Sequence, residues 1–393
     1  MSRRLLISAM PGETRAAWLD DGRLADLLIR RDDRPSVADN VYLGRVRALD
    51  KGLEGAFIDI GLARPGLLPL AEAPRGLCEG DALVVRVRGE PSEDKGARLT
   101  TKIGPPEPEA ARVAAPALLR AAGDPIAAAL TAADPPEEIV TDDPATFARA
   151  KAAFDGRPDL RDRLMLSPDP APLFDRDEVE DQIDALLQPH VPLPSGGGLL
   201  IEPVRTLTAI DVNSGRHHAR AGAAKAALAL DLEAAAAIPR QVRLRGLSGL
   251  LVVDFLGLDD PDARTRVVKA LRAGLAEDPR PTRVHAMRRS GLVEMTRRRA
   301  GPALHEILTE PCGIGGTGRV KDPVTLAYHA LRAARRAAAA ARGRPVAIHG
   351  APRVVAALDG PVKAARTALE ERLGRALDLR DDPGRADFET VIG

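Results

Sequence analysis

Two apolar segments, each carrying one aspartate, constrain this chain most. Residues 207–212 and 249–256 are rich in Leu, Ile, Val and Ala, and they contain Asp211 and Asp254 near their C-terminal ends. The alanine-rich segment 219–240 between them is long enough for a helix. This order predicts two buried, neighbouring parallel strands joined by a right-handed helical crossover. The two carboxylates should therefore meet at one edge of a sheet.

An ionised carboxylate on a buried strand is costly, and a second one beside it raises the cost. Each aspartate could cap its strand or pair with an arginine, or both could share a divalent cation. Asn213 lies two residues after Asp211, on the same side of the strand, where an amide can orient a carboxylate or a metal-bound water. Oxygen ligands favour Mg²⁺ or Mn²⁺. The residues alone thus suggest metal-assisted phosphodiester hydrolysis.

Three motifs carry a more specific signal: LTAIDVNSGR, LEAAAAIPRQVRLRGLSGLLVVDF and GLVEMTRRR. They resemble the catalytic signature of the ribonuclease E/G family of bacterial endoribonucleases, and the resemblance runs in register from Leu193 to Arg299. It implies that Asp211, Asn213 and Asp254 are catalytic and that the two aspartates bind Mg²⁺, with Mn²⁺ as an alternative.

Charge distribution and cysteine content limit which partners and which cellular compartment fit this chain. Residues 104–190 carry 8 Lys and Arg against 18 Asp and Glu, whereas residues 195–301 carry 18 against 11. A basic segment around the motifs fits a polyanionic substrate. Two cysteines exclude a disulfide framework and suit a reducing cytoplasm. No signal peptide and no run of ~18 apolar residues is present. We therefore expect a cytoplasmic protein without a membrane partner.

Residues 39–103 contain short strands separated by Gly and Pro turns, a pattern typical of a five-stranded OB barrel. They resemble the S1-type RNA-binding domain of the family, which implies RNA contacts for Phe57 and Lys95. A second family aromatic is replaced here by Leu67. One stacking platform is worth ~1–3 kcal/mol per base, so we expect reduced RNA affinity. The alternative for Phe57 is a core aromatic.

Two further family features are incomplete. The Pro- and Ala-rich segment 104–123 predicts a linker in place of most of the family's 5′-sensor, which recognises a 5′-monophosphate. Residues 308–320 retain Cys312 but lack the second cysteine through which two family chains share one Zn²⁺. We therefore expect no zinc, and a homodimer held by apolar contacts.

Several basic residues are candidates for phosphate contact. The loop GRHHAR (215–220) includes Arg216, and Arg289 lies where the family carries a basic residue next to the scissile phosphate. Residues 287–299 are interpreted as a basic helix. The helix 219–240 is expected to end near Pro239, with three arginines following that either contact RNA or pair with acids and helix carbonyls: Arg240, Arg243 and Arg245.

The predicted fold class is α+β and multidomain. The resemblance implies an RNase H-like subdomain with an inserted S1-type OB barrel, a DNase I-like catalytic subdomain and a small C-terminal α/β dimerisation domain. The boundaries are 1–38 with 124–188 (RNase H-like), 39–103 (barrel), 104–123 (linker), 189–307 (catalytic), 308–320 (degenerate zinc-link) and 321–393 (C-terminal domain).

The predicted function is Mg²⁺-dependent endonucleolytic cleavage of single-stranded RNA in RNA processing, rRNA processing included, and decay, leaving 5′-phosphate and 3′-hydroxyl ends. We expect no acidic scaffold tail of the kind that, in the largest relatives, would serve degradosome assembly. Two alternatives remain open: a catalytically weak RNA-binding paralogue, and a metal nuclease that acts on DNA. Mg²⁺-dependent product formation separates the first from an enzyme, and cleavage of a matched DNA oligonucleotide would favour the second.

Overall fold

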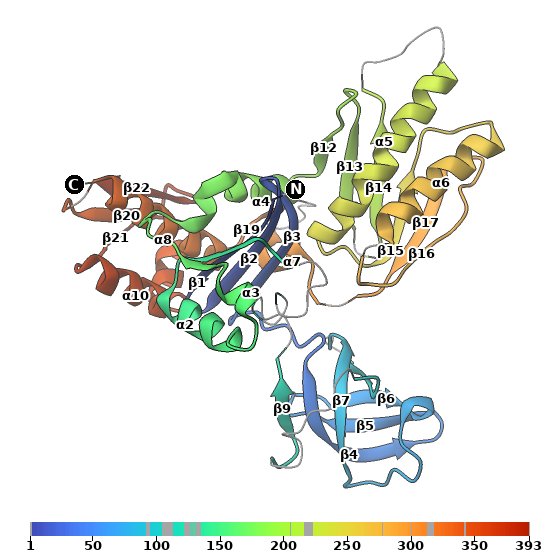
Figure 1. Cartoon of the computed structure of the whole chain (residues 1–393), viewed down its shortest axis with the longest axis horizontal. Helices are drawn as coiled ribbons and strands as arrows, with labels where there is room; N and C mark the ends of the chain where they lie inside the picture. Colours follow the sequence, from blue (N-terminus) through green and yellow to red (C-terminus); the bar gives the residue numbers. More distant parts are fainter. Residues whose placement is uncertain are drawn as a thin grey trace.

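The computed structural model describes residues 2–91, 95–103, 113–121, 126, 129, 135–204, 206–215, 223–276, 278–299, 301–312, 318–341 and 343–392. These residues form several separate sheets with helices packed on them (Figure 1), which confirms the predicted α+β class.

The N-terminal sheet has the strand order β11-β10-β1-β2-β3. β1, β2 and β3 form an antiparallel meander, and β10 and β11 run parallel to β1. Alternate residues of β1 face different cores: Leu5 and Ile7 pack toward α2 and α3, and Leu6 packs toward α4. The elements are β1 (Arg3–Met10), β2 (Glu13–Asp20), β3 (Arg23–Arg31), β10 (Glu138–Thr141), β11 (Leu164–Leu166), α2 (Pro144–Ala153), α3 (Pro158–Arg161), η3 (Leu173–Glu178) and α4 (Val179–Leu187).

A closed barrel is inserted between β3 and β10. Its strands pair in the order β5-β6-β8-β7-β4, and β4 pairs with β5 to close the ring. The predicted five-stranded, OB-like barrel is thereby confirmed. Within the segment expected to be a linker, β9 pairs with β4, so this part of the linker extends the barrel wall. The elements are β4 (Val41–Asp50), β5 (Gly55–Asp59), β6 (Gly66–Pro69), η1 (Leu70–Glu72), β7 (Ala82–Gly89), β8 (Arg98–Thr100) and β9 (Ala117–Arg120).

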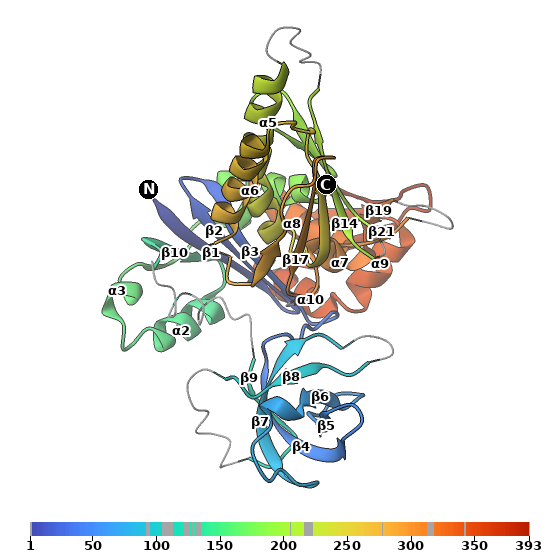
Figure 2. The same ribbon diagram turned by 90° about the vertical axis from the view of Figure 1, so that its right-hand side faces the viewer.

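The central sheet has six strands in the order β12-β13-β14-β15-β17-β16. Two helices, α5 and α6, pack together on one face of it (Figures 1 and 2). The elements are β12 (His190–Pro192), β13 (Gly198–Pro203), β14 (Thr208–Asn213), α5 (Ala223–Leu244), β15 (Gly249–Asp254), α6 (Pro261–Leu275), β16 (Thr282–Val284) and β17 (Leu292–Arg297).

The helix α5 does not end near Pro239, as expected, but continues to Leu244. A proline inside a helix removes one backbone hydrogen bond. Here its ring packs against α6, because a Cβ added to Gly274 would lie 2.7 Å from Cγ of Pro239. Pro239 therefore lies where the two helices approach each other closely.

The C-terminal unit is a three-stranded sheet, in the order β21-β20-β22, packed against helices. Its long helix α8 is joined to the N-terminal sheet by buried ion pairs. Arg332 pairs with Glu13, and Arg335 lies 2.8 Å from Asp142. The elements are α7 (Leu304–Leu308), β18 (Thr309–Pro311), β19 (Arg319–Lys321), α8 (Pro323–Ala340), β20 (Val346–Gly350), α9 (Pro352–Asp359), α10 (Lys363–Leu373), β21 (Asp378–Asp381) and β22 (Phe388–Ile392).

Candidate active site

Asp211 and Asp254 are direct neighbours at one end of the central sheet. β14 and β15 run parallel, and their register places Asp211 opposite Asp254. The two residues lie near the C-terminal ends of their strands, as the sequence predicts. Neighbouring strands are ~4.8 Å apart, so the two side chains, which we call the carboxylate pair, leave the sheet side by side.

The two strands, predicted to be buried, are buried on one face of the sheet only. Ile210, Val212, Leu251 and Val253 are buried beneath α5 and α6, whereas Asp211 is half-buried and Asp254 is exposed. The two helices cover only one face of the sheet. The carboxylate pair lies on the other face, so solvent lowers the desolvation cost that full burial would impose.

The electrostatics of the carboxylate pair favour a cation. Partial burial and the charge of Asp254 raise the pKa of Asp211. Asn213 lies on the same face, and its Nδ2 donates a hydrogen bond to Oδ2 of Asp211 at 3.1 Å, which fixes the carboxylate orientation. A bound divalent cation would relieve the repulsion between the two carboxylates.

The donor set fits Mg²⁺ or Mn²⁺ better than a metal that needs a full protein cage. In the described part of the chain, no group of three or more His, Cys, Asp and Glu side chains could hold a metal ion. Mg²⁺ is commonly bound by one or two carboxylates and keeps several waters. Two neighbouring carboxylates on an open sheet face meet that requirement.

Two contacts fix the chain that follows Asp254. Gly291 has φ +91°, and a Cβ added to it would lie 2.3 Å from the carbonyl oxygen of Phe255. Asp231 of α5 is fully buried, and its Oδ1 accepts a hydrogen bond from the backbone N–H of Leu256 at 3.0 Å. Sequence reasoning missed both residues. The available signals were the glycine before a strand and an acid, one of two, in an alanine-rich helix.

A glycine turn supports the neighbouring strand end. The segment 193–198 forms the turn between β12 and β13, with the N–H of Leu193 donating to the carbonyl of Gly197 at 2.9 Å. A Cβ at Gly197 would lie 2.8 Å from the carbonyl oxygen of Asn213. Only glycine fits this contact without displacing the strand that carries Asp211 and Asn213.

The segment interpreted as a basic helix, residues 287–299, is a turn followed by the strand β17. Arg289 is exposed in that turn, at the sheet end of the carboxylate pair, because Leu292 pairs with Asp254. Arg297, by contrast, is buried and lies 2.7 Å from Asp278. β17 is a strand because its alternate residues, Val293 and Met295, fill the core under α6.

The arginines near the end of α5 contact protein rather than open surface. Arg240 donates to the carbonyl of Leu24 at 2.8 and 3.1 Å, and Arg243 donates to the carbonyl of Ala25 at 3.1 Å. These bonds dock the central sheet on β3. Burial and the charges of nearby arginines lower the pKa of Arg240 to about 10.

The structure does not bring the barrel residues to the carboxylate pair. Phe57 is half-buried on β5 opposite Leu67 of β6, and Lys95 is exposed. In both views the barrel lies beyond the end of α5, whereas the carboxylate pair lies at the sheet end where α5 begins (Figures 1 and 2).

Two other predicted residues, Arg216 and Cys312, lie outside the described ranges or next to a gap in them. Arg216 lies outside the described residues, as do both histidines that follow it. Cys312 is exposed and unpaired, and residues 313–317 after it lie outside the described part. No helix among the described residues is long and apolar enough to span a membrane.

Comparisons with known proteins agree with the motif resemblance. A sequence model of the Ribonuclease E/G family matches residues 98–300, more than half of the chain. Ribonuclease G of Escherichia coli (strain K12) is 26% identical over 488 aligned positions that cover all of both chains. Ribonuclease G of Haemophilus influenzae is 28% identical over 84% of this chain and 86% of that protein. Ribonuclease E of the same organism is 29% identical over 84% of this chain and 45% of that protein.

The alignment with the Escherichia coli protein also bears on length. It has 488 positions, and this chain has 393 residues. At least 95 positions, the difference between these numbers, therefore fall opposite gaps in this chain.

Proposed function

The chain belongs to the ribonuclease E/G family and is therefore an endoribonuclease; from this premise we propose that it cuts single-stranded RNA with a divalent cation bound by Asp211 and Asp254. The observation that carries the proposal is the register of β14 and β15, which makes the two carboxylates neighbours on an open sheet face.

Each side chain has a distinct task in this proposal. Asp211 and Asp254 would hold Mg²⁺, or Mn²⁺ in its place. Asn213 keeps the Asp211 carboxylate in one orientation through its hydrogen bond. When bound, the cation supplies a water of lowered pKa and positive charge for the phosphate oxygens. Arg289, exposed at the same sheet end, offers a guanidinium for a neighbouring phosphate.

Substrate binding is proposed for the barrel. Phe57 would stack on a base there, and Lys95 would contact a phosphate. Arg216, which belongs to the segment 215–220 and not to the barrel, would also contact a phosphate. Products would carry 5′-phosphate and 3′-hydroxyl ends. The barrel lies apart from the carboxylate pair, so a bound RNA strand would have to extend from one to the other. The RNase H-like, S1-type and DNase I-like identities of the three units, and a homodimer through the C-terminal unit, are part of the same proposal.

The test uses a labelled single-stranded RNA with Mg²⁺, comparing wild type, Asp211→Asn, Asp254→Asn and the control Asp259→Asn. Asp259 is exposed beyond the strand end, so its loss should leave cleavage unchanged. Loss of either proposed ligand should reduce cleavage on the order of 10²-fold or more, since metal stabilisation is worth several kcal/mol.

A second readout is independent of catalysis. Titration with Mn²⁺, followed calorimetrically, should show weaker binding for both ligand variants and unchanged binding for Asp259→Asn. Cleavage that survives Asp254→Asn would refute the proposed site. Tight RNA binding without any product from the wild type would instead identify a catalytically weak RNA-binding paralogue, a reading that Leu67 and the lone Cys312 favour. Equal cleavage of matched DNA would refute RNA specificity.

A further inference from the structure

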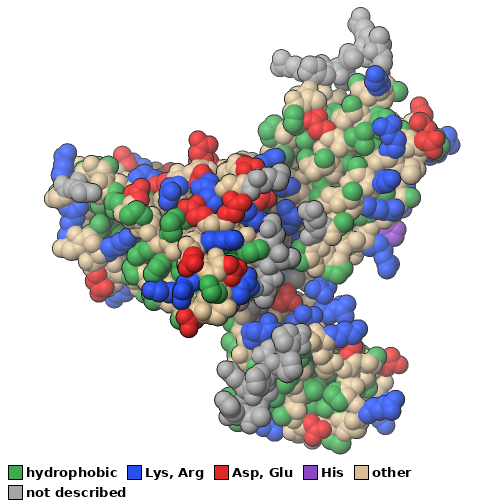
Figure 3. All heavy atoms as spheres, viewed as in Figure 1, with side chains coloured by type: hydrophobic (Ala, Val, Ile, Leu, Met, Phe, Trp, Pro, Cys, Tyr) green, Lys and Arg blue, Asp and Glu red, His purple; other side chains and the backbone are tan. Residues whose placement is uncertain are grey.

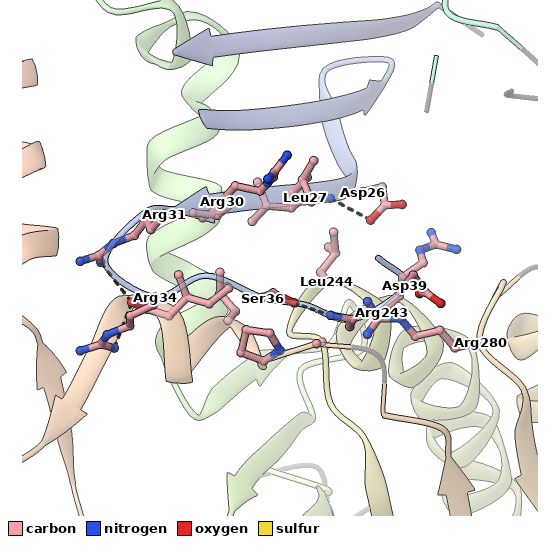
Figure 4. Close-up of a pocket in the computed structure, with 18 of the residues that line it drawn as sticks. Asp26, Leu27, Arg30, Arg31, Arg34, Ser36, Asp39, Arg243, Leu244 and Arg280 are labelled. Atoms are coloured by element: carbon pink, nitrogen blue, oxygen red, sulfur yellow. Dashed lines mark hydrogen bonds between the residues drawn. The ribbon is translucent and has the colours of Figure 1, made fainter. Parts of the chain in front are cut away.

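A cavity of about 330 Å³ lies between the N-terminal sheet, the segment leading into the barrel and the central sheet. Its walls come from β3, from residues 32–39, from the end of α5 and from residues 278–280 before β16. Figure 4 shows Arg243, Arg280 and Asp39 at one end of this cavity and Arg31 and Arg34 at the other. Arginines thus enter it from opposite sides.

Two of the lining arginines have no partner within the described residues. Neither Arg30 nor Arg280 takes part in a side-chain hydrogen bond or an ion pair. Arg243 uses one nitrogen to donate to the carbonyl of Ala25, and its buried Nε has no hydrogen-bond partner. Burial and the charge of Arg297 lower the pKa of Arg280, although the charges of Asp278, Asp26 and Asp39 act in the opposite direction.

The acids that line the cavity do not fully neutralise it. Six arginines and four aspartates form its walls. Asp278 is committed to Arg297 at 2.7 Å, and Asp39 lies 3.9 Å from Arg86 of the barrel. Burial raises the pKa of Asp26, although Arg243 and Arg280 act in the opposite direction. Arg31 and Arg34 are ion-paired with Asp33 and Asp322. The guanidinium groups left to attract an anion are therefore those of Arg30, Arg243 and Arg280.

We propose that this cavity binds a phosphate group of the RNA strand as it passes between the barrel and the carboxylate pair, an inference that rests on the proposed function. Guanidinium groups match phosphate oxygens in both charge and hydrogen-bond geometry. The cavity lies at the end of the central sheet that is remote from the carboxylate pair, because Arg297 pairs with Gly249 at the start of β15.

The length of β15 sets the distance to the scissile bond. The strand has six residues, so its ends are five steps apart, which at 3.3 Å per step is roughly 17 Å. The bound phosphate would therefore belong to a nucleotide several positions from the cleaved bond. Lys and Arg side chains gather where the barrel meets the rest of the chain (Figure 3), along the route that such a strand would follow.

The experiment measures RNA affinity in EDTA, where cleavage is suppressed, by fluorescence anisotropy at several salt concentrations. The variant is Arg30→Gln with Arg280→Gln, chosen because neither side chain stabilises the described fold through a bond of its own. The control is Arg266→Gln, an exposed arginine on α6. The double variant should bind roughly tenfold more weakly. Its log–log salt slope should fall by about 0.7, the value for one phosphate on a single strand.

The outcomes separate this inference from the proposed function. Wild type that cleaves RNA, together with a double variant whose affinity and salt slope match wild type, overturns the phosphate site and leaves the proposed function intact. Wild type that neither binds nor cleaves RNA overturns both. A third arm adds a nucleoside monophosphate and follows thermal unfolding: if the double variant loses that stabilisation but binds RNA normally, the cavity holds a free nucleotide and the RNA assignment is wrong.

Discussion

Asp231→Asn should remove a pH dependence of stability that is built into the core of the central sheet. Asp231 is fully buried on α5, its Oδ1 accepts the N–H of Leu256, and its Oδ2 has no partner. Burial raises the pKa of this carboxyl from 3.8 to about 7. The folded state therefore holds a proton that the unfolded chain has already released, and stability falls as pH rises from about 4 to about 7.

The magnitude follows from the shift. At 1.36 kcal/mol per unit, the full loss is about 4 kcal/mol, of which about 2 kcal/mol falls between pH 5.5 and 7.5. Asparagine does not titrate, and its Oδ1 can still accept the N–H of Leu256. Its amide nitrogen would be left unpaired, at a cost of about 1–3 kcal/mol that is the same at every pH. The stability of the variant should thus increase relative to that of wild type as pH rises.

Hydrogen exchange of the β15 amides measures this difference without assuming that the whole chain unfolds as one unit. Comparing wild type with Asp231→Asn at each pH cancels the intrinsic exchange rate. The ratio of protection factors should change roughly 30-fold between pH 5.5 and 7.5. Asp259→Asn, at an exposed carboxyl, should show no such trend. A ratio for Asp231→Asn that is constant over this range would refute the reasoning.

Three further substitutions test the chain that follows Asp254, a buried ion pair and the barrel. Gly291→Ala should weaken Mn²⁺ binding and lower the unfolding temperature, because the added Cβ would lie 2.3 Å from a carbonyl oxygen. The control Gly249→Ala, whose Cβ meets nothing within 4 Å, should cost only the ~1 kcal/mol of a left-handed residue. Equal losses of stability in the two variants would contradict this. Asp278→Asn should destabilise the chain to urea by about 3–5 kcal/mol by leaving Arg297 buried without its anion; a loss under ~1 kcal/mol would show that the pair is solvated. Leu67→Phe should tighten RNA binding in EDTA by ~1–3 kcal/mol if the barrel stacks bases, and unchanged affinity would contradict that role.

The parts of the site that sequence predicted well depend on local signals. Two apolar runs separated by a helix-forming segment are enough to place Asp211 beside Asp254, because a parallel crossover brings the carboxyl ends of both strands to one edge. Strands and turns of the barrel were equally accessible, since Gly and Pro mark where each strand stops. The closed barrel, however, was predicted from the overall pattern of strands and turns and not from any single residue.

The sequence did not show which face of the central sheet the helices cover, and the remaining features of the site depend on that. Residues 207–212 are as apolar as a fully buried strand, yet α5 and α6 both pack on one side and leave Asp211 half-buried. The same limitation applies to Arg297, whose place in a basic run suggested phosphate contact, although it is buried against Asp278. The role of Asp231 required knowing that α5 lies over the chain that follows Asp254.

The ion pairs beneath α8 have a consequence for how the chain is made. Glu13 and Arg332 are separated by 319 residues. Asp142 is likewise synthesised long before its partner Arg335. At ~5–20 residues per second, a ribosome needs roughly 15–65 s to deliver Arg332 after Glu13 has emerged. Until then Glu13 has only Arg15 beside it, and Asp142 has only the hydroxyl of Ser8 and the backbone N–H of Ala9. The first strands to be synthesised should therefore be among the last to become stable, while the barrel, closed by its own strands, can fold during the wait.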